Sequence, residues 1–156
     1  MNRPYGSQDG FTLIEAVCAM AIIGLVAAVL LPNIPQQTSR PRLEAYAIQI
    51  ATLLKTDRNA AIGNRQVVAT LIDAPSRTLR SGATGEVLRV PDDVRLDSVL
   101  PRSCNDHTVG AEIDFFPSGM SCGGMIVLSR RDTGFEVQVN WLTGKVDVGV
   151  QSHAAP

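Results

Sequence analysis

The chain is poor in cysteine and carries almost no surplus of charge. Three cysteines among 156 residues are too few for a miniature domain built on disulfides. Fourteen basic and fifteen acidic side chains give a formal net charge of -1, which excludes a polybasic protein attracted as a whole to nucleic acid or anionic surfaces. Internal repeats and low-complexity tracts are also missing, so solenoid, collagen-like and disordered classes are excluded.

A long apolar run near the amino terminus is the strongest feature present. Residues 16–31 hold no charged and no strongly polar side chain. As a helix, residues 11–31 would be about 32 Å long, enough to span the hydrocarbon core of a bilayer. The run is followed by Pro32 and lacks the small-residue cleavage site of a secretory signal, so we expect it to be retained as a transmembrane helix.

Glu15 places a carboxyl group just inside this run. A charged carboxylate in a membrane helix costs a few kcal/mol on insertion scales. Either the side chain has a function or it reaches the bilayer interface, and its position near the end of the run allows both interpretations.

The sequence G-F-T-L-I-E at residues 10–15, followed by the apolar run, resembles the processing site of type IV pilins and of the pseudopilins of type II secretion. The resemblance implies that a prepilin peptidase cleaves between Gly10 and Phe11, removes residues 1–10 as a leader and methylates the new amino group of Phe11. It also implies that Glu15 neutralises the terminal ammonium of a neighbouring subunit in an apolar filament core.

Prolines at positions 32, 35 and 41 predict an interruption, after which an amphipathic helix begins near Arg42 and ends around residues 63–64. Its apolar positions have helical spacing and predict one face against a core. These positions are Leu43, Ala47, Ile50, Leu54 and Ala61. We expect a solvated face formed by Glu44, Lys55, Asp57 and Arg58.

After residue 65 the hydrophobic period changes to two, which predicts half-buried antiparallel strands at residues 67–72, 112–115, 135–141 and 145–150. The predicted fold class is α+β, with a long N-terminal helix packed on antiparallel sheet. Together with the resemblance to pilins and pseudopilins, these patterns imply a cleaved leader at 1–10, a transmembrane and filament-core helix at 11–31, a kinked linker and amphipathic helix at 32–64, and a periplasmic β domain at 65–156.

Three segments of the C-terminal half, I-D-F-F-P-S-G at 113–119, Gly123-Gly124 and V-N-W-L-T-G-K-V at 139–146, resemble the H-type minor pseudopilins and their minor-pilin relatives. The resemblance implies a non-enzymatic subunit near the tip of the type II secretion pseudopilus, which helps to initiate assembly and to export folded periplasmic proteins. It implies a single-pass protein of the inner membrane with its C-terminal domain in the periplasm. The implied partners are the other minor pseudopilins, the major pseudopilin, prepilin peptidase, inner-membrane lipid and the inner-membrane assembly platform.

The alternative is a minor pilin of a type IV pilus, a class that includes DNA-binding subunits with basic C-terminal ends. Residues 148–156 contain no Lys or Arg, so we expect no nucleic-acid partner. Arg130 and Arg131 form the one adjacent basic pair after the apolar run, and in a turn such charges normally serve solubility.

A disulfide between Cys104 and Cys122 fits a periplasmic domain, and two independent loop thiols are the alternative. Zinc is disfavoured because Cys104, His107 and Cys122 include no C-x-x-C pair and have no fourth ligand. Calcium is disfavoured because Asp92, Asp93 and Asp97 lack the ligand density of a dedicated loop, and we expect them to face solvent. No metal and no cofactor is therefore expected.

A literal G-x-S-x-G pattern at residues 119–123 raises the possibility of a hydrolase nucleophile elbow. An elbow requires a strand, a sharp turn and a helix, whereas residues 124–129 have the composition of a strand. The candidate bases would be His107 and the near-terminal His153. A glycine-rich hairpin is the preferred interpretation, and no enzymatic activity is expected.

Overall fold

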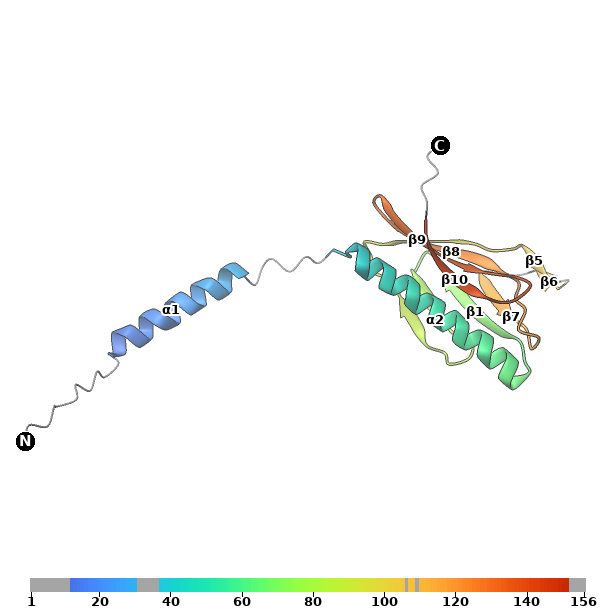
Figure 1. Ribbon diagram of the computed structural model, residues 1–156, viewed down its shortest axis with the longest axis horizontal. Coiled ribbons are helices and arrows are strands. Elements are labelled where there is room, and N and C mark those ends of the chain that lie inside the picture. Colours follow the sequence, from blue (N-terminus) through green and yellow to red (C-terminus); the bar gives the residue numbers. More distant parts are fainter. Residues whose placement is uncertain (1–11, 31–36, 106, 109, 152–156) are drawn as a thin grey trace, which may run out of the picture. The chain divides into compact units, whose positions relative to one another are not determined.

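The computed structural model describes residues 12–30, 37–105, 107–108 and 110–151 (Figure 1). The chain divides into two compact units, residues 1–36 and 37–156, and each is described by itself. The predicted cleavage site at Gly10 and Phe11 lies outside the described residues, as do Pro32 and Pro35.

The first unit contains helix α1, Leu13–Leu30. Glu15, in the first turn, is its one charged residue. Every described side chain from Thr12 to Val26 is exposed, and the apolar ones include Leu13, which is 83% exposed, and Met20, which is 75% exposed. The helix therefore lacks a polar face, and its described side chains from Thr12 to Val26 are not buried against other residues of its unit. No helix within the described ranges reaches the length and apolarity of a membrane span.

The second unit begins with helix α2, Arg40–Asn64. The helix starts two residues before the predicted position because Pro41 lies in its first turn, where a backbone N–H has no intrahelical acceptor. Its C-cap is Arg65, which has a left-handed φ of 55° and donates its N–H to the carbonyl of Ala61. The predicted apolar face is confirmed, since Leu43, Ala47, Ile50, Leu54 and Ala61 are all buried.

Two four-stranded antiparallel sheets follow, together with a small two-stranded one. In the first sheet the order is β3 (Val87–Arg89), β2 (Thr78–Arg80), β1 (Val68–Asp73) and β7 (Glu112–Phe115). In the second it is β10 (Val146–Val150), β9 (Thr133–Val139), β8 (Gly124–Arg130) and β4 (Arg95–Val99). The third pairs β5 (Ser103–Cys104) with β6 (His107–Thr108).

Helix α2 packs on strands of both large sheets, β1 and β7 in one and β9 and β10 in the other. One hydrophobic core joins the three elements, and its largest fully buried side chains include Phe115, Ile113 and Leu128. The predicted α+β class with a helix on antiparallel sheet is confirmed. The short strands β2, β3 and β4 were not predicted from the sequence.

Asp57 does not face solvent, and the prediction that it belongs to a solvated face is wrong. Its carboxylate is completely buried and accepts four hydrogen bonds. The hydroxyl groups of Thr70 and Ser81 donate two, and the backbone N–H groups of Gly82 and Ala83 donate the others at 3.2 and 3.1 Å. These bonds connect α2 to β1 and to the turn after β2, and they satisfy a charge whose burial would otherwise be unfavourable.

Arg58 is half-buried, so its predicted place on the solvated face is also wrong. Its Nε donates to the carbonyl oxygen of Gly119 at 3.1 Å, and its Nη2 donates to that of Thr143 at 3.0 Å. The guanidinium thereby holds two turns, the one before β8 and the one before β10, against the C-terminal end of α2.

Candidate functional site

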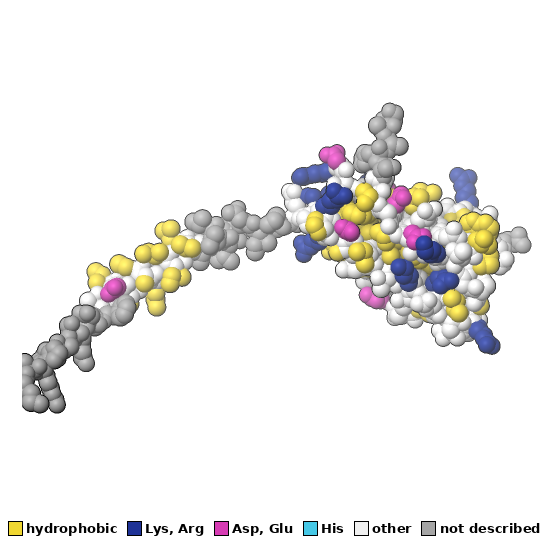
Figure 2. Space-filling view, in the orientation of Figure 1, with side chains coloured by type: hydrophobic (Ala, Val, Ile, Leu, Met, Phe, Trp, Pro, Cys, Tyr) yellow, Lys and Arg dark blue, Asp and Glu magenta, His cyan; other side chains and the backbone are white. Residues whose placement is uncertain are grey.

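The exposed surface of α1 is the first candidate site. Figure 2 shows hydrophobic side chains covering the described part of this helix on the face in view. Fully burying one large aliphatic side chain is worth about 1.5 to 3 kcal/mol, so a helix that exposes many of them has a strong tendency to associate with apolar surroundings. The helix can therefore act as an anchor or as an assembly element.

Glu15 is exposed in the first turn of this helix and has no ion-pair partner among the described residues. A carboxylate in the first turn is favoured by the positive end of the helix dipole. Among the described residues no cation pairs with the Glu15 carboxylate, which leaves it available to a cation of another molecule. This arrangement can recognise a cation.

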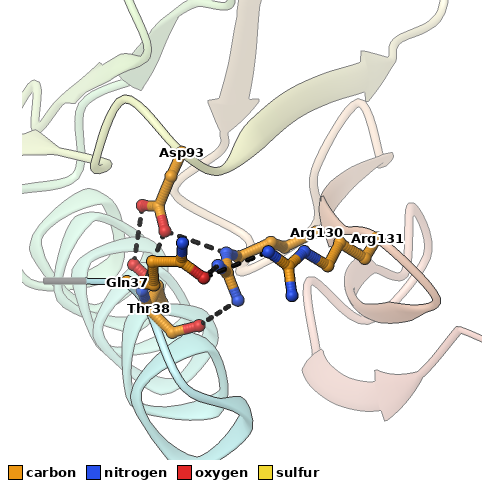
Figure 3. A network of polar contacts seen from close by, with 5 residues as sticks. All are labelled: Gln37, Thr38, Asp93, Arg130 and Arg131. Carbon is orange, nitrogen blue, oxygen red and sulfur yellow. Dashed lines mark hydrogen bonds and ion pairs between the residues drawn. The ribbon is translucent and has the colours of Figure 1, made fainter. Parts of the chain in front are cut away.

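A polar network holds the start of the second unit in place (Figure 3). The carboxylate of Asp93 accepts hydrogen bonds from the backbone N–H and the hydroxyl of Thr38, both at 2.8 Å. Arg130 pairs its Nε with Asp93 at 2.8 Å and donates from Nη1 to the carbonyl of Thr38 at 2.7 Å. Thr38 is buried, so the residue before the N-cap of α2 is fixed on the β4 and β8 side of the domain.

Gln37 extends this network. Its Oε1 accepts from Arg130 at 2.8 Å and from Arg131 at 3.1 Å, and Figure 3 shows both guanidinium groups directed toward it. The interpretation of Arg130 and Arg131 as charges that only aid solubility is therefore wrong. They attach the first residues of the unit to the turn between β8 and β9.

Asp93 does not simply face solvent, in contrast to the sequence-based expectation. The hydrogen bonds from Thr38 hold the pKa of Asp93 below its ordinary value of 3.8, and the positive charge of Arg130 acts in the same direction. Asp92 is 91% exposed at its side chain, and Asp97 pairs with Arg95 at 2.7 Å. These three carboxylates do not converge, and no group of three metal-binding side chains occurs within the described part of the chain.

Cys104 and Cys122 are joined by a disulfide that attaches β5 to the segment before β8. Sulfur atoms in a disulfide are not thiolates, so these two residues do not offer zinc ligands in this state. Asp114 lies beside the bridge, with Oδ2 at 3.6 Å from the Sγ of Cys122. Partial burial raises the pKa of Asp114 above its ordinary value.

Ser121, the central residue of the G-x-S-x-G pattern, is buried and structural. Its hydroxyl donates to the carbonyl of Asp114 at 2.7 Å, and its N–H donates to the carbonyl of Trp141 at 3.0 Å. Strand β8 begins three residues later, so the predicted strand is confirmed and the helix of a nucleophile elbow is not formed at this position. The side chain of His107 and all of His153 lie outside what the structure describes.

The sequence matches the model of the prokaryotic N-terminal methylation motif over residues 6–31. Across 149 residues it is 28% identical to the type II secretion system protein H of Xanthomonas campestris, a match that covers 94% of this chain and 86% of the relative. It is 27% identical to a fimbrial protein of Pseudomonas aeruginosa over 69% of this chain and 77% of the relative.

Two solved structures share the fold. The minor pseudopilin EpsH from the type 2 secretion system of Vibrio cholerae aligns with a TM-score of 0.55 at 14% identity, over 69% of this chain and 95% of the other. The type IV minor pilin FimU of Pseudomonas aeruginosa aligns with a TM-score of 0.51 at 15% identity, over 72% of this chain and 91% of the other. The predicted resemblance to pilin-like minor pseudopilins is thereby confirmed, and the fold is pilin-like.

Proposed function

We propose that this pilin-like chain is a non-enzymatic minor pseudopilin of a type II secretion pseudopilus, positioned near its tip. There it helps to initiate assembly and to export folded periplasmic proteins. The observation that carries the proposal is a helix with apolar side chains all around and one acid in its first turn, inside a matched N-methylation motif. The similarity to a type II secretion protein H over most of both chains favours secretion.

In this proposal a prepilin peptidase cleaves after Gly10 and methylates Phe11. Residues 11–31 then anchor the chain as a single span of the inner membrane, and residues 37–156 lie in the periplasm. The apolar run of the sequence and the methylation motif support the anchor. The disulfide between Cys104 and Cys122 supports an oxidising compartment.

Within the pseudopilus, α1 packs among the corresponding helices of neighbouring subunits. The Glu15 carboxylate then pairs with the terminal ammonium of Phe11 of a neighbour. Each charge would be unfavourable alone in an apolar filament core, so pairing both selects the correct axial position of the incoming subunit. The partners are the other minor pseudopilins, the major pseudopilin and the inner-membrane assembly platform.

The second candidate is a minor pilin of a type IV pilus, which the likeness to fimbrial protein and FimU favours. The two functions require the same anchor and the same processing, so only the neighbouring subunits separate them.

In-cell photocrosslinking from the outer face of α2 tests the proposal. A photoreactive residue replaces Ile48, which is 51% exposed, and the matched control replaces Ile50, which is completely buried on the same helix. Capture of secretion pseudopilins from position 48 and not from position 50 supports the proposal. Capture of pilus subunits moves the chain to the type IV pilus, and capture of neither kind of subunit in cells that assemble both filaments rejects the two candidates together.

A further inference from the structure

Strand β10 forms an edge of the second sheet, since the strand order places it beside β9 alone (Figure 1). In an antiparallel pair, alternate residues direct their backbone N–H and C=O groups toward the partner strand. The N–H of Gln151 bonds Gly134, and the carbonyl of Lys145 bonds Asn140. With the register Val148 to Val137, odd-numbered residues of β10 therefore bond β9, and Val146, Val148 and Val150 direct their backbone groups away from the sheet.

The end of this strand is accessible. The exposed fraction rises from 4% at Val146 to 39% at Val148 and 57% at Val150. Lys145 and Asp147, which pair at 2.7 Å, carry the charges at the start of the strand, whereas residues 148–150 are uncharged. Within the described ranges, no strand bonds the outward backbone groups of β10. Such a row of backbone groups beside exposed β-branched side chains is the chemistry to which an extended polypeptide adds.

Two of the other edges of the large sheets are protected in ways that β10 is not. Strand β3 has only three residues. At β7 the carbonyl of Asp114 is occupied by the hydroxyl of Ser121 and the N–H of Cys122. Short length and cover are among the means by which proteins block strand addition, and five-residue β10 has neither. Strand β4 resembles β10, since it has an ion pair at its start, between Arg95 and Asp97, and ends on Val99, which is 66% exposed.

We propose that β10 is a docking edge that accepts an antiparallel strand from a neighbouring pilin-like subunit, and this rests on the proposed function. The orientation follows from α2. Arg58, near the C-terminal end of α2, donates a hydrogen bond to Thr143, just before β10 begins. Gln37, just before α2 begins, accepts one from Arg130 at the end of β8. The turn after Arg130 leads into β9, whose first residues lie beside the end of β10. Strand β10 therefore runs antiparallel to α2.

This orientation restricts the partner strand. Two copies of β10 that paired with each other in antiparallel fashion would set their α2 helices in opposite directions. This conflicts with the proposed function, in which all subunits share one fold and one membrane topology. The added strand must instead run in the same direction as the α2-type helix of its own subunit. In this fold β4 has that direction, since it is separated from β10 by two intervening antiparallel strands. The partner is thus a subunit that offers an edge equivalent to β4.

The test uses the full chain in cells that assemble the pseudopilus. Photoreactive residues replace Asp147 and Val150 in separate strains, and the captured partner peptides are mapped by mass spectrometry. Antiparallel addition requires that position 150 captures a partner residue on the amino-terminal side of the residue captured by position 147, within one segment. The same order along both chains, or capture on separate elements, overturns the proposal.

Two variants at Val148 separate backbone pairing from simple apolar contact. Val148→Pro removes an outward N–H that bonds no strand of this domain, whereas Val148→Ala keeps the N–H and loses the side chain. We expect Val148→Pro to reduce capture about 10-fold, because it removes one backbone hydrogen bond to the added strand and disturbs the alignment of the adjacent one. Val148→Ala should reduce capture less than about 3-fold. Equal losses, or no loss with proline, overturn strand addition. An unchanged unfolding midpoint of Val148→Pro shows that the edge position tolerates proline.

Failure of this inference is distinguishable from failure of the proposed function. Capture of pseudopilins from position 48 together with no effect of Val148→Pro retains the function and overturns the docking edge. Ordered antiparallel capture of a protein that is not pilin-like contradicts both the proposed function and the partner named here.

Discussion

The hydroxyl of Thr70 on β1 donates a hydrogen bond to the completely buried carboxylate of Asp57 on α2. The same carboxylate receives the hydroxyl of Ser81 and two backbone N–H groups from the turn after β2. The Asp57 side chain therefore attaches α2 both to β1 and to the turn between β2 and β3 in the first sheet.

We predict that Asp57→Asn destabilises the domain by about 2 to 4 kcal/mol, because an amide presents donors to groups that are themselves donors. The measurement is urea unfolding of residues 37–156, a segment that contains the whole hydrophobic core. Glu44→Gln, on the exposed face of the same helix, is the control and should change stability by less than about 0.5 kcal/mol. Equal effects of the two substitutions would contradict the assigned role of Asp57.

Lowering the pH should reduce the stability that the hydrogen bonds and the ion pair of Asp93 contribute to the domain. Because the folded-state pKa of Asp93 lies below its ordinary value of 3.8, the stability it contributes is present above that value and is lost as pH falls through the lower folded pKa. The stability difference between wild type and Asp93→Asn should therefore be largest at neutral pH and shrink in acid. Unfolding free energies measured over a pH series check this, and a constant difference would contradict it.

The pKa of Asp114 is shifted in the opposite direction from that of Asp93, so its effect on stability should change with pH in the opposite direction. Burial raises its pKa, so its favourable contribution is complete below 3.8 and is lost as pH rises through the folded pKa. Relative to wild type, Asp114→Asn should therefore become more stable as pH rises through that range. A trend in the same direction as that of Asp93→Asn would show that the two carboxylates are not distinguished by their surroundings.

Reduction of the disulfide between Cys104 and Cys122 should destabilise the domain by about 3 kcal/mol on the chain-entropy model, given a sequence separation of 18. The double variant Cys104→Ala, Cys122→Ala measures the same loss without reductant. Mass spectrometry under non-reducing conditions identifies the bridge in the wild type. Two free thiols in the exported wild-type protein would contradict the pairing.

Glu15→Gln should leave the chain in the membrane and reduce its recovery in sheared filaments at least tenfold, because the neutral amide cannot neutralise a neighbour's terminal ammonium. Glu15→Asp keeps the charge and should retain more incorporation than the amide. Quantitative immunoblots of the membrane and filament fractions provide the measurement. Equal incorporation of Glu15→Gln and wild type would remove Glu15 from the assembly mechanism.

Periodicity predicted the elements whose side chains sort cleanly by polarity. The α2 stripe from Leu43 to Ala61 and the alternation from Phe135 to Val139 in β9 are confirmed because their buried residues are apolar. The apolar face predicted for β10 is confirmed only at Val146, since Val148 and Val150 are 39% and 57% exposed. Asp57 breaks that rule, since its donors lie on β1 and in the turn after β2. A pattern within one helix cannot show that a carboxylate will be satisfied by residues from other elements.

The short strands and the network at Asp93 were missed for a related reason. Strands β2 and β3 have three residues each, too few to establish a period of two. Arg130 and Asp93 are separated along the chain and meet only because β4 pairs with β8. The Gly10 to Glu15 motif, in contrast, is local, so it could be recognised without any knowledge of tertiary contacts.

The most direct test of the account is the intact mass and N-terminal sequence of the full-length chain produced with a prepilin peptidase, beside Gly10→Val as the matched control. The account predicts a mature wild-type chain that begins with N-methylated Phe11 and a control that keeps residues 1–10 and an unmethylated amino terminus. A wild-type chain that still begins at Met1 in the presence of active peptidase, or identical termini in the two proteins, would contradict it.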